Sequence, residues 1–213
     1  MKFAPIQKGL AIIASCLATV TIAQANSLTP GNFIGLSLEV EPVGATLLAT
    51  TNVSFSGIDA GNNVLFSGTL TSSVWSGDTS NPYGGLTFTY QLTSALSSLH
   101  TIDRFTLNSF SGLLTDVGYN GAGIVPIRAV RPGSDLIAFV FENALFQPTL
   151  GPGLSSATLV IQTDSLYWAI GSGSVIDGAT ASVSAFAPIA VPEPTSMALV
   201  GLGVAALLFR RKS

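Results

Sequence analysis

The sequence predicts an all-β protein, an antiparallel β-sandwich with a jelly-roll-like arrangement of about eight or more strands. Residues 34–40 and 86–92 alternate apolar and polar side chains with a strict period of two, which is typical of strands with one buried face. Clusters of Gly, Asn, Asp and Pro separate such stretches. Between residues 26 and 190, no segment shows capped helical periodicity over ten residues or more.

The remaining strands follow from shorter alternating or apolar stretches between turn signals. Thr and Ser at the alternate positions supply an uncharged outer face that suits a pleated sheet. The chain divides into an N-terminal segment 1–25, one β domain over 26–190 and a tail 191–213, with no internal linker. The further strands are expected at residues 46–56, 64–75, 100–107, 127–131, 136–141, 157–163 and 181–187.

Charge is scarce in this 213-residue chain, at 9% of residues, against about 25% in ordinary soluble domains. Residues 26–190 contain three arginines, no lysine and ten acidic residues, a formal charge of −7. Nucleic-acid binding depends on basic side chains that neutralise phosphates, so this balance argues against a nucleic-acid partner.

The N-terminus has the pattern of a secretory signal peptide, which we expect to form a helix. A basic start at Lys2 and Lys8 precedes an apolar stretch over 9–22, and Ala23 and Ala25 form a signal-peptidase box before Asn26. An alternative uses residues 13–16, which resemble a lipobox with Cys16 as the acylated residue. On the first interpretation the mature chain has no cysteine.

The C-terminus contains three features in a fixed order. We expect Pro192, Glu193 and Pro194 to form an extended segment, because prolines so spaced are excluded from a helix interior. Residues 197–209 are predicted to form an apolar transmembrane helix of about 20 Å, short against a hydrocarbon core of about 30 Å. Arg210, Arg211 and Lys212 follow as a basic stop that stays cytoplasmic.

Together, residues 191–213 resemble the PEP-CTERM sorting signal of bacteria. The resemblance implies recognition and processing by an exosortase, and export to the cell surface or the biofilm matrix. The logic parallels a GPI signal, in which a polar processing site precedes a disposable apolar tail. The alternative is an ordinary C-terminal anchor with a chance pair of prolines.

Candidate catalytic residues are few. His100 lies three residues before Asp103 in a serine-rich chain, which leaves a Ser-His-Asp triad open, although a structural histidine is the favoured interpretation. Glu39 and Glu41 share one strand face about 7 Å apart, which overlaps the spacing of an inverting glycosidase pair. A solvent-exposed strand shows the same pattern. One histidine cannot complete a zinc site.

Two ligand hypotheses remain beside plainer interpretations. Asp116 and Asn120 place oxygens in a glycine-rich segment, which makes them a weak calcium candidate against a simple turn. Calcium is the one cofactor considered, and no other is expected. Trp75, Tyr83, Tyr167 and Trp168 are candidates for a sugar-binding platform, or else for core residues.

The expected function is therefore non-enzymatic: an exported surface or extracellular-matrix structural protein, associated with biofilm or exopolysaccharide. The alternative is a surface-displayed carbohydrate-binding module. Signal peptidase and an exosortase are the expected partners during export, with matrix polysaccharide as a further candidate. Contact with the membrane is expected only through the tail, before processing.

Overall fold

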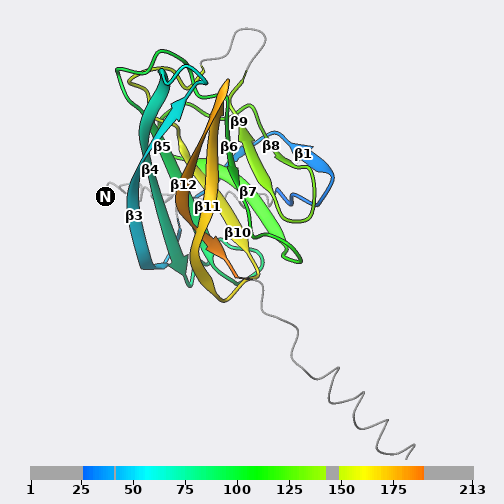
Figure 1. Cartoon of the computed structure of the whole chain (residues 1–213). Helices are drawn as coiled ribbons and strands as arrows, with labels where there is room; N and C mark the ends of the chain where they lie inside the picture. Colours follow the sequence, from blue (N-terminus) through cyan, green and yellow to red (C-terminus); the bar gives the residue numbers. More distant parts are fainter. Residues whose placement is uncertain (1–25, 41, 143–148, 190–213) are drawn as a thin grey trace, which may run out of the picture.

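The computed structural model describes residues 26–40, 42–142 and 149–189, and all regular structure there is β-strand (Figure 1). These residues form twelve strands in two six-stranded sheets. Sheet A has the order β2-β7-β10-β5-β4-β3 and sheet B the order β1-β8-β9-β6-β11-β12. All pairs are antiparallel except β2 with β7. The strands are β1 (Asn32–Ile34), β2 (Ser37–Leu38), β3 (Thr46–Ile58), β4 (Val64–Ser76), β5 (Thr87–Ser94), β6 (Arg104–Leu107), β7 (Thr115–Asn120), β8 (Arg128–Arg131), β9 (Ile137–Val140), β10 (Thr158–Thr163), β11 (Trp168–Asp177) and β12 (Ala179–Pro188).

The two sheets pack face to face through a single apolar core. Alternate residues of each strand point inward, and the buried cluster joins Phe88 and Tyr90 of β5 to Phe105 of β6 and Phe139 of β9. The rings of Tyr90 and Phe105 meet across the core with centroids 5.8 Å apart. The Tyr90 hydroxyl donates a hydrogen bond of 2.7 Å to the carbonyl of Phe186, so this buried polar group has a partner.

Arg131, the last residue of β8, points into the interior and is 2% exposed. Its guanidinium supplies hydrogen bonds to a ring of main-chain carbonyls at one end of the core. The acceptors, at 2.7–3.3 Å, are the carbonyls of Leu28, Phe110, Leu113 and Ser134 and the hydroxyl of Thr115. Arg131 thus ties four segments of the chain together.

The all-β prediction is confirmed, and most expected strands are present within a few residues of their predicted bounds. Strands β3, β4, β5, β8, β9, β10 and β12 overlap the predicted segments closely, whereas β6 occupies only the second half of 100–107. Sequence neighbours pair in β3-β4-β5, β8-β9 and β11-β12. The other neighbouring pairs, such as β5 with β10 and β6 with β11, join strands that are distant in the sequence.

Two regions differ from the prediction. Residues 34–40 do not form one strand, because β1 belongs to sheet B and β2 to sheet A, and the chain crosses between the sheets here. Strands β7 and β11 were not expected. Both are rich in glycine or short polar residues, which have low intrinsic strand preference.

The predicted signal-peptide helix over 1–25 and the C-terminal transmembrane helix lie outside the described residues. In the part of the chain that the structure does describe, no helix has the length and hydropathy needed to cross a bilayer.

Candidate functional site

The outer face of sheet A is hydroxyl- and amide-rich and contains a groove of about 360 Å³. The face arises because the inward positions of β4, β5, β7 and β10 are apolar and the alternate positions point to the other side. The Trp75 indole N–H donates a 3.1 Å hydrogen bond to Thr89 Oγ1, which fixes the ring beside the groove. Its lining residues are Pro42, Trp75, Thr89, Asn120 and Thr158.

Beside this groove lies a buried acidic cluster that we define as Glu39, Asp78 and Asp116 with the amide of Gln162. Gln162 is the direct cross-strand partner of Asp116, and its amide nitrogen donates to Asp78 Oδ2 at 3.3 Å. Three oxygens in the cluster have no hydrogen-bond partner: Glu39 Oε1, Asp116 Oδ1 and Gln162 Oε1. The cluster therefore holds more acceptors than donors.

The electrostatics of the acidic cluster differ from residue to residue. Burial, followed by the charges of Asp116 and Asp78, raises the pKa of Glu39 to about 7. Burial likewise raises the pKa of Asp116 to about 6. Burial would raise the pKa of Asp78 too, but hydrogen bonds from Ser80, Thr87 and Val43 outweigh it and lower that pKa. Glu39 is thus the group that holds a proton near neutral pH.

Glu39 reaches this position because Gly118 of β7 has no side chain. The Glu39 side chain lies across the place that a Cβ at Gly118 would occupy. Its backbone N–H donates 2.7 Å to the Tyr119 carbonyl, which anchors the residue beside β7. The alternation in residues 34–40 predicted an exposed glutamate, yet Glu39 is 4% exposed and Leu38 is solvent-facing.

The predicted calcium site at Asp116 and Asn120 is corrected, because both residues lie in strand β7 and not in a loop. Residues four apart on a strand are separated by about 13 Å, whereas calcium ligands lie about 2.3–2.6 Å from the ion. The two side chains therefore cannot share one ion. Among the residues that the structure describes, no group of three or more His, Cys, Asp or Glu side chains could hold a metal.

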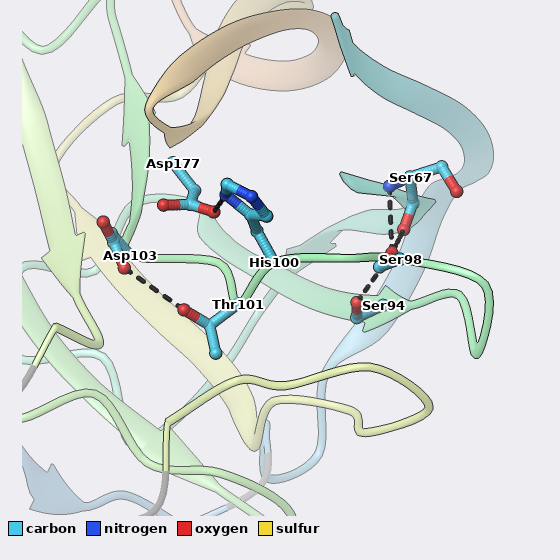
Figure 2. Close-up of polar contacts among 7 residues, drawn as sticks. All are labelled: Ser67, Ser94, Ser98, His100, Thr101, Asp103 and Asp177. Carbon is cyan, nitrogen blue, oxygen red and sulfur yellow. Dashed lines mark hydrogen bonds and ion pairs between the residues drawn. The ribbon is translucent and has the colours of Figure 1, made fainter. Parts of the chain in front are cut away.

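His100 contacts an acid, but no hydrogen bond links it to a serine within the described ranges. His100 lies in the segment before β6. Figure 2 shows its ring directed at Asp177, with His100 Nδ1 3.0 Å from Asp177 Oδ2. Burial, then the charge of Asp177, raises the pKa of Asp103 to about 6. The histidine side chain is 47% exposed, so the contact lies at the surface.

The nearby serines belong to a separate structural network (Figure 2). Ser98 Oγ donates to the Ser67 carbonyl at 2.9 Å and accepts from the Ser67 N–H at 3.0 Å. The Ser94 hydroxyl donates to the same oxygen at 3.2 Å. Because the only proton of Ser98 is already donated to β4, this hydroxyl is a poor nucleophile candidate.

The other predicted sites are dispersed or lie beyond the described residues. Glu41 is not described, so its pairing with Glu39 stays a prediction. Trp75 belongs to sheet A, whereas Trp168 in sheet B packs edge-on against Phe186 at 5.0 Å, so these two do not share a platform. Outside the described residues are Cys16, Ala23, Ala25, Pro192, Glu193, Pro194, Arg210, Arg211 and Lys212.

The sequence analysis missed the acidic cluster and the inward-pointing Arg131. The members of the acidic cluster are 38 or more residues apart in the sequence, and the residues next to each of them form no recognisable motif. One signal was present in the glycine at position 118, because an isolated glycine in a strand often marks a close approach by another group.

Of three comparisons with known proteins, the one with protein families finds a match. No curated protein and no solved structure matches the chain. The family model of the PEP-CTERM protein-sorting motif matches residues 190–212, which confirms the resemblance of the tail. The matched segment begins two residues after β12 ends at Pro188. The chain therefore carries a PEP-CTERM sorting motif at its C-terminus.

Proposed function

We propose that this protein is a non-enzymatic structural component of the cell surface or extracellular matrix, delivered by export and exosortase sorting. The supporting observation is the PEP-CTERM motif at 190–212, which implies export, an exosortase as processing partner and a membrane-anchored transit state. The motif follows the last strand almost directly, so the whole sandwich precedes the processing site. In this route, signal peptidase cleaves after Ala25 and removes residues 1–25.

A structural role agrees with the chemistry of the described residues. Among the described residues, His100 pairs with Asp177, and the hydroxyl of Ser98 is bound to β4. The acidic cluster is buried beneath the surface of sheet A. Hydrolysis of a glycan or ester by the purified protein, lost on replacing Glu39, Glu41 or His100, would overturn the proposal.

The decisive test is the intact mass of the protein recovered from the surface and medium of its native host, with peptide mapping of both termini. The proposal requires a chain that begins at Asn26 and ends near residues 192–196, with or without an adduct. A chain that still contains Arg210 to Ser213 would identify a plain membrane anchor and contradict the sorting step.

A second candidate, a carbohydrate-binding module, is favoured by the groove at Trp75. An aromatic face beside Asn120 and two threonine hydroxyls offers both a stacking surface and hydrogen-bond partners for an uncharged sugar. Retardation in an affinity gel containing neutral matrix polysaccharide, lost in Trp75→Ala, would support this candidate. Equal mobility with and without the polysaccharide would reject it.

A further inference from the structure

A second groove, of about 460 Å³, lies on the outer face of sheet B and differs in chemistry from the one at Trp75. It extends over β6, β8, β9, β11 and β12, which Figure 1 shows side by side. The groove-lining residues of these strands point outward, because their odd-numbered neighbours, such as Phe105, Phe139 and Val175, are buried in the core. Two arginines, Arg104 and Arg128, line the groove together with the hydroxyl-bearing residues Thr106, Ser174 and Thr180.

The strand register places the two arginines in one row. Arg104 of β6 and Arg128 of β8 are both cross-strand partners of Val140 in β9, from opposite sides. Neighbouring strands are about 4.8 Å apart, so the two Cα atoms are separated by about 10 Å. Val140 between them is 2% exposed and forms part of an apolar floor.

Both guanidinium groups are accessible to an anion. Arg104 and Arg128 are exposed, and among the described residues neither pairs with an acid, since the ion pair found there joins His100 to Asp177. Arg128 lies 6.0 Å from the centroid of the Phe33 ring, a contact that leaves its hydrogen-bond donors available.

The two groove arginines belong to a domain in which acidic residues outnumber basic ones. Residues 26–190 contain three basic side chains and ten acidic ones, and the third arginine, Arg131, is buried among carbonyls. Both exposed arginines of this part of the chain therefore line one groove. The rest of the surface repels anions, so attraction is concentrated here.

We propose that this groove binds a carboxylate-bearing oligosaccharide, of the uronate type. Guanidinium groups bind carboxylates through paired, parallel hydrogen bonds. The hydroxyls of Ser174 and Thr180 match sugar hydroxyls, and the apolar floor matches the C–H face of a sugar ring. The proposal goes beyond the structural role above, which requires no ligand.

A peptide fits the groove less well. Peptides that bind to sheets add a strand to an open edge, but β9 is already paired with β6 and β8 on its two sides. Recognition must therefore come from side chains alone, and the side-chain groups available are two guanidinium groups and several hydroxyls.

The test is calorimetric titration of the full chain, purified in a neutral detergent, with a defined oligogalacturonate. The fully methyl-esterified oligosaccharide of the same length serves as the uncharged comparison. We expect the acid form to bind, the ester form not to bind, and added NaCl to weaken binding. Arg104→Gln and Arg128→Gln should each weaken affinity by about ten- to one-hundredfold, as expected for lost charge-assisted hydrogen bonds.

The controls separate a specific site from a change in net charge. Asn52→Asp changes the net charge by the same amount but lies on exposed β3 of sheet A, and it should leave affinity unchanged. Arg128→Lys keeps the charge without the fork and should give an intermediate affinity. Thermal melting verifies that every variant is folded.

Three results would overturn the proposal. The first is no binding of oligogalacturonate, and the second is affinity that is unchanged in the Arg104→Gln and Arg128→Gln double variant. The third is equal binding of poly-glutamate, which would show a general anion site instead of a sugar-acid site. None of these results affects the mass measurement that tests sorting.

Discussion

Arg131 illustrates how a buried charge can organise a β-sandwich through main-chain carbonyls, with no ion pair to an acid among the described residues. Its guanidinium replaces lost hydration with seven hydrogen bonds, six of them to main-chain carbonyls. These carbonyls belong to Leu28, Phe110, Leu113 and Ser134, which lie outside the strands, so no strand pairing supplies them with hydrogen bonds. The residue is therefore part of the fold and not of a ligand site.

We predict that Arg131→Met destabilises the protein by about 3 kcal/mol or more. The carbonyls of Leu113 and Ser134 lose the Arg131 donor, and those of Leu28 and Phe110 keep only a second donor, Thr115 Oγ1 and the Leu113 N–H. Urea unfolding measures this free energy. Arg128→Met is the matched control, since Arg128 is exposed, and it should change stability by no more than about 0.5 kcal/mol. Equal effects of the two substitutions would contradict the role assigned to Arg131.

Glu39 gives a prediction with a defined pH dependence. Its pKa is raised from 4.5 to about 7 in the folded protein, so folding favours the protonated form. The wild-type protein therefore loses stability as the pH rises from about 4.5 to about 7, because the unfolded chain has released this proton there while the folded protein still holds it. Glu39→Gln cannot ionise and escapes that loss.

We accordingly expect Glu39→Gln to match the wild type at about pH 4 and to exceed it at pH 8, by about 1–3 kcal/mol. Unfolding midpoints measured in urea across that range test the prediction. Asp116→Asn should show the same direction, since burial also raises the pKa of Asp116. A wild-type stability that stays flat from pH 5 to 8 would contradict the protonation of Glu39.

At the scale of elements, the expected strands are those whose side chains alternate strongly. Strand β5 alternates polar and apolar residues over 87–93, and β3 and β4 form a long hairpin of 13 residues each. Their local pattern and their final environment agree. Strand β7 was expected to be a loop because Asp, Gly and Asn are poor strand formers. It is a strand because β10 and β2 pair with it on both sides.

Strand β11 was missed for a related reason. Its glycines, Gly171 and Gly173, interrupt the alternation that marks a strand. A Cβ at Gly173 would lie 2.8 Å from the Thr106 carbonyl of β6, so the close pairing of these strands requires glycine. That requirement depends on the neighbouring strand and is invisible in the local sequence.

Gly118 provides the prediction at this scale. A methyl group there would lie 2.7 Å from Glu39 Oε1, and closer still to Glu39 Cγ. Gly118→Ala should therefore destabilise the protein by about 1–3 kcal/mol through overpacking. Its φ is not positive, so the backbone itself tolerates alanine.

A double-mutant cycle isolates the cause. In a Glu39→Ala background the same Gly118→Ala substitution should cost less, with a coupling energy of about 1–2 kcal/mol. Urea unfolding of the four proteins gives that energy. Additive effects would show that Gly118 is required for some other contact.

For the whole molecule, the sorting motif and the sandwich are adjacent along the chain and have separate tasks. The last described strand ends at Pro188, and the matched motif begins at residue 190. The sandwich has its own core and its own clamp at Arg131. Changes in the tail should therefore affect processing without affecting folding.

We predict that replacing Pro192 and Pro194 together with alanine leaves export intact and blocks C-terminal processing. Prolines with this spacing disfavour a helix, whereas alanine favours one, so the substitution changes the conformational preference of the recognition segment. Mass measurement of the exported protein reads out the retained tail. A matched pair of alanines at Thr195 and Ser196 should still be processed. Unchanged processing of the proline variant would count against recognition of this motif.

The sequence by itself determined the sorting motif, the all-β class and the strands with strong alternation. Each of these is a local pattern, because a peptide signal or a period of two is complete within about ten residues. The tertiary structure decided which side chains meet. Arg104 and Arg128 line one groove because β6 and β8 both pair with β9, and Glu39 joins Asp116 because Gly118 leaves room. Register and close approach arise between distant segments, so no single stretch of sequence specifies them.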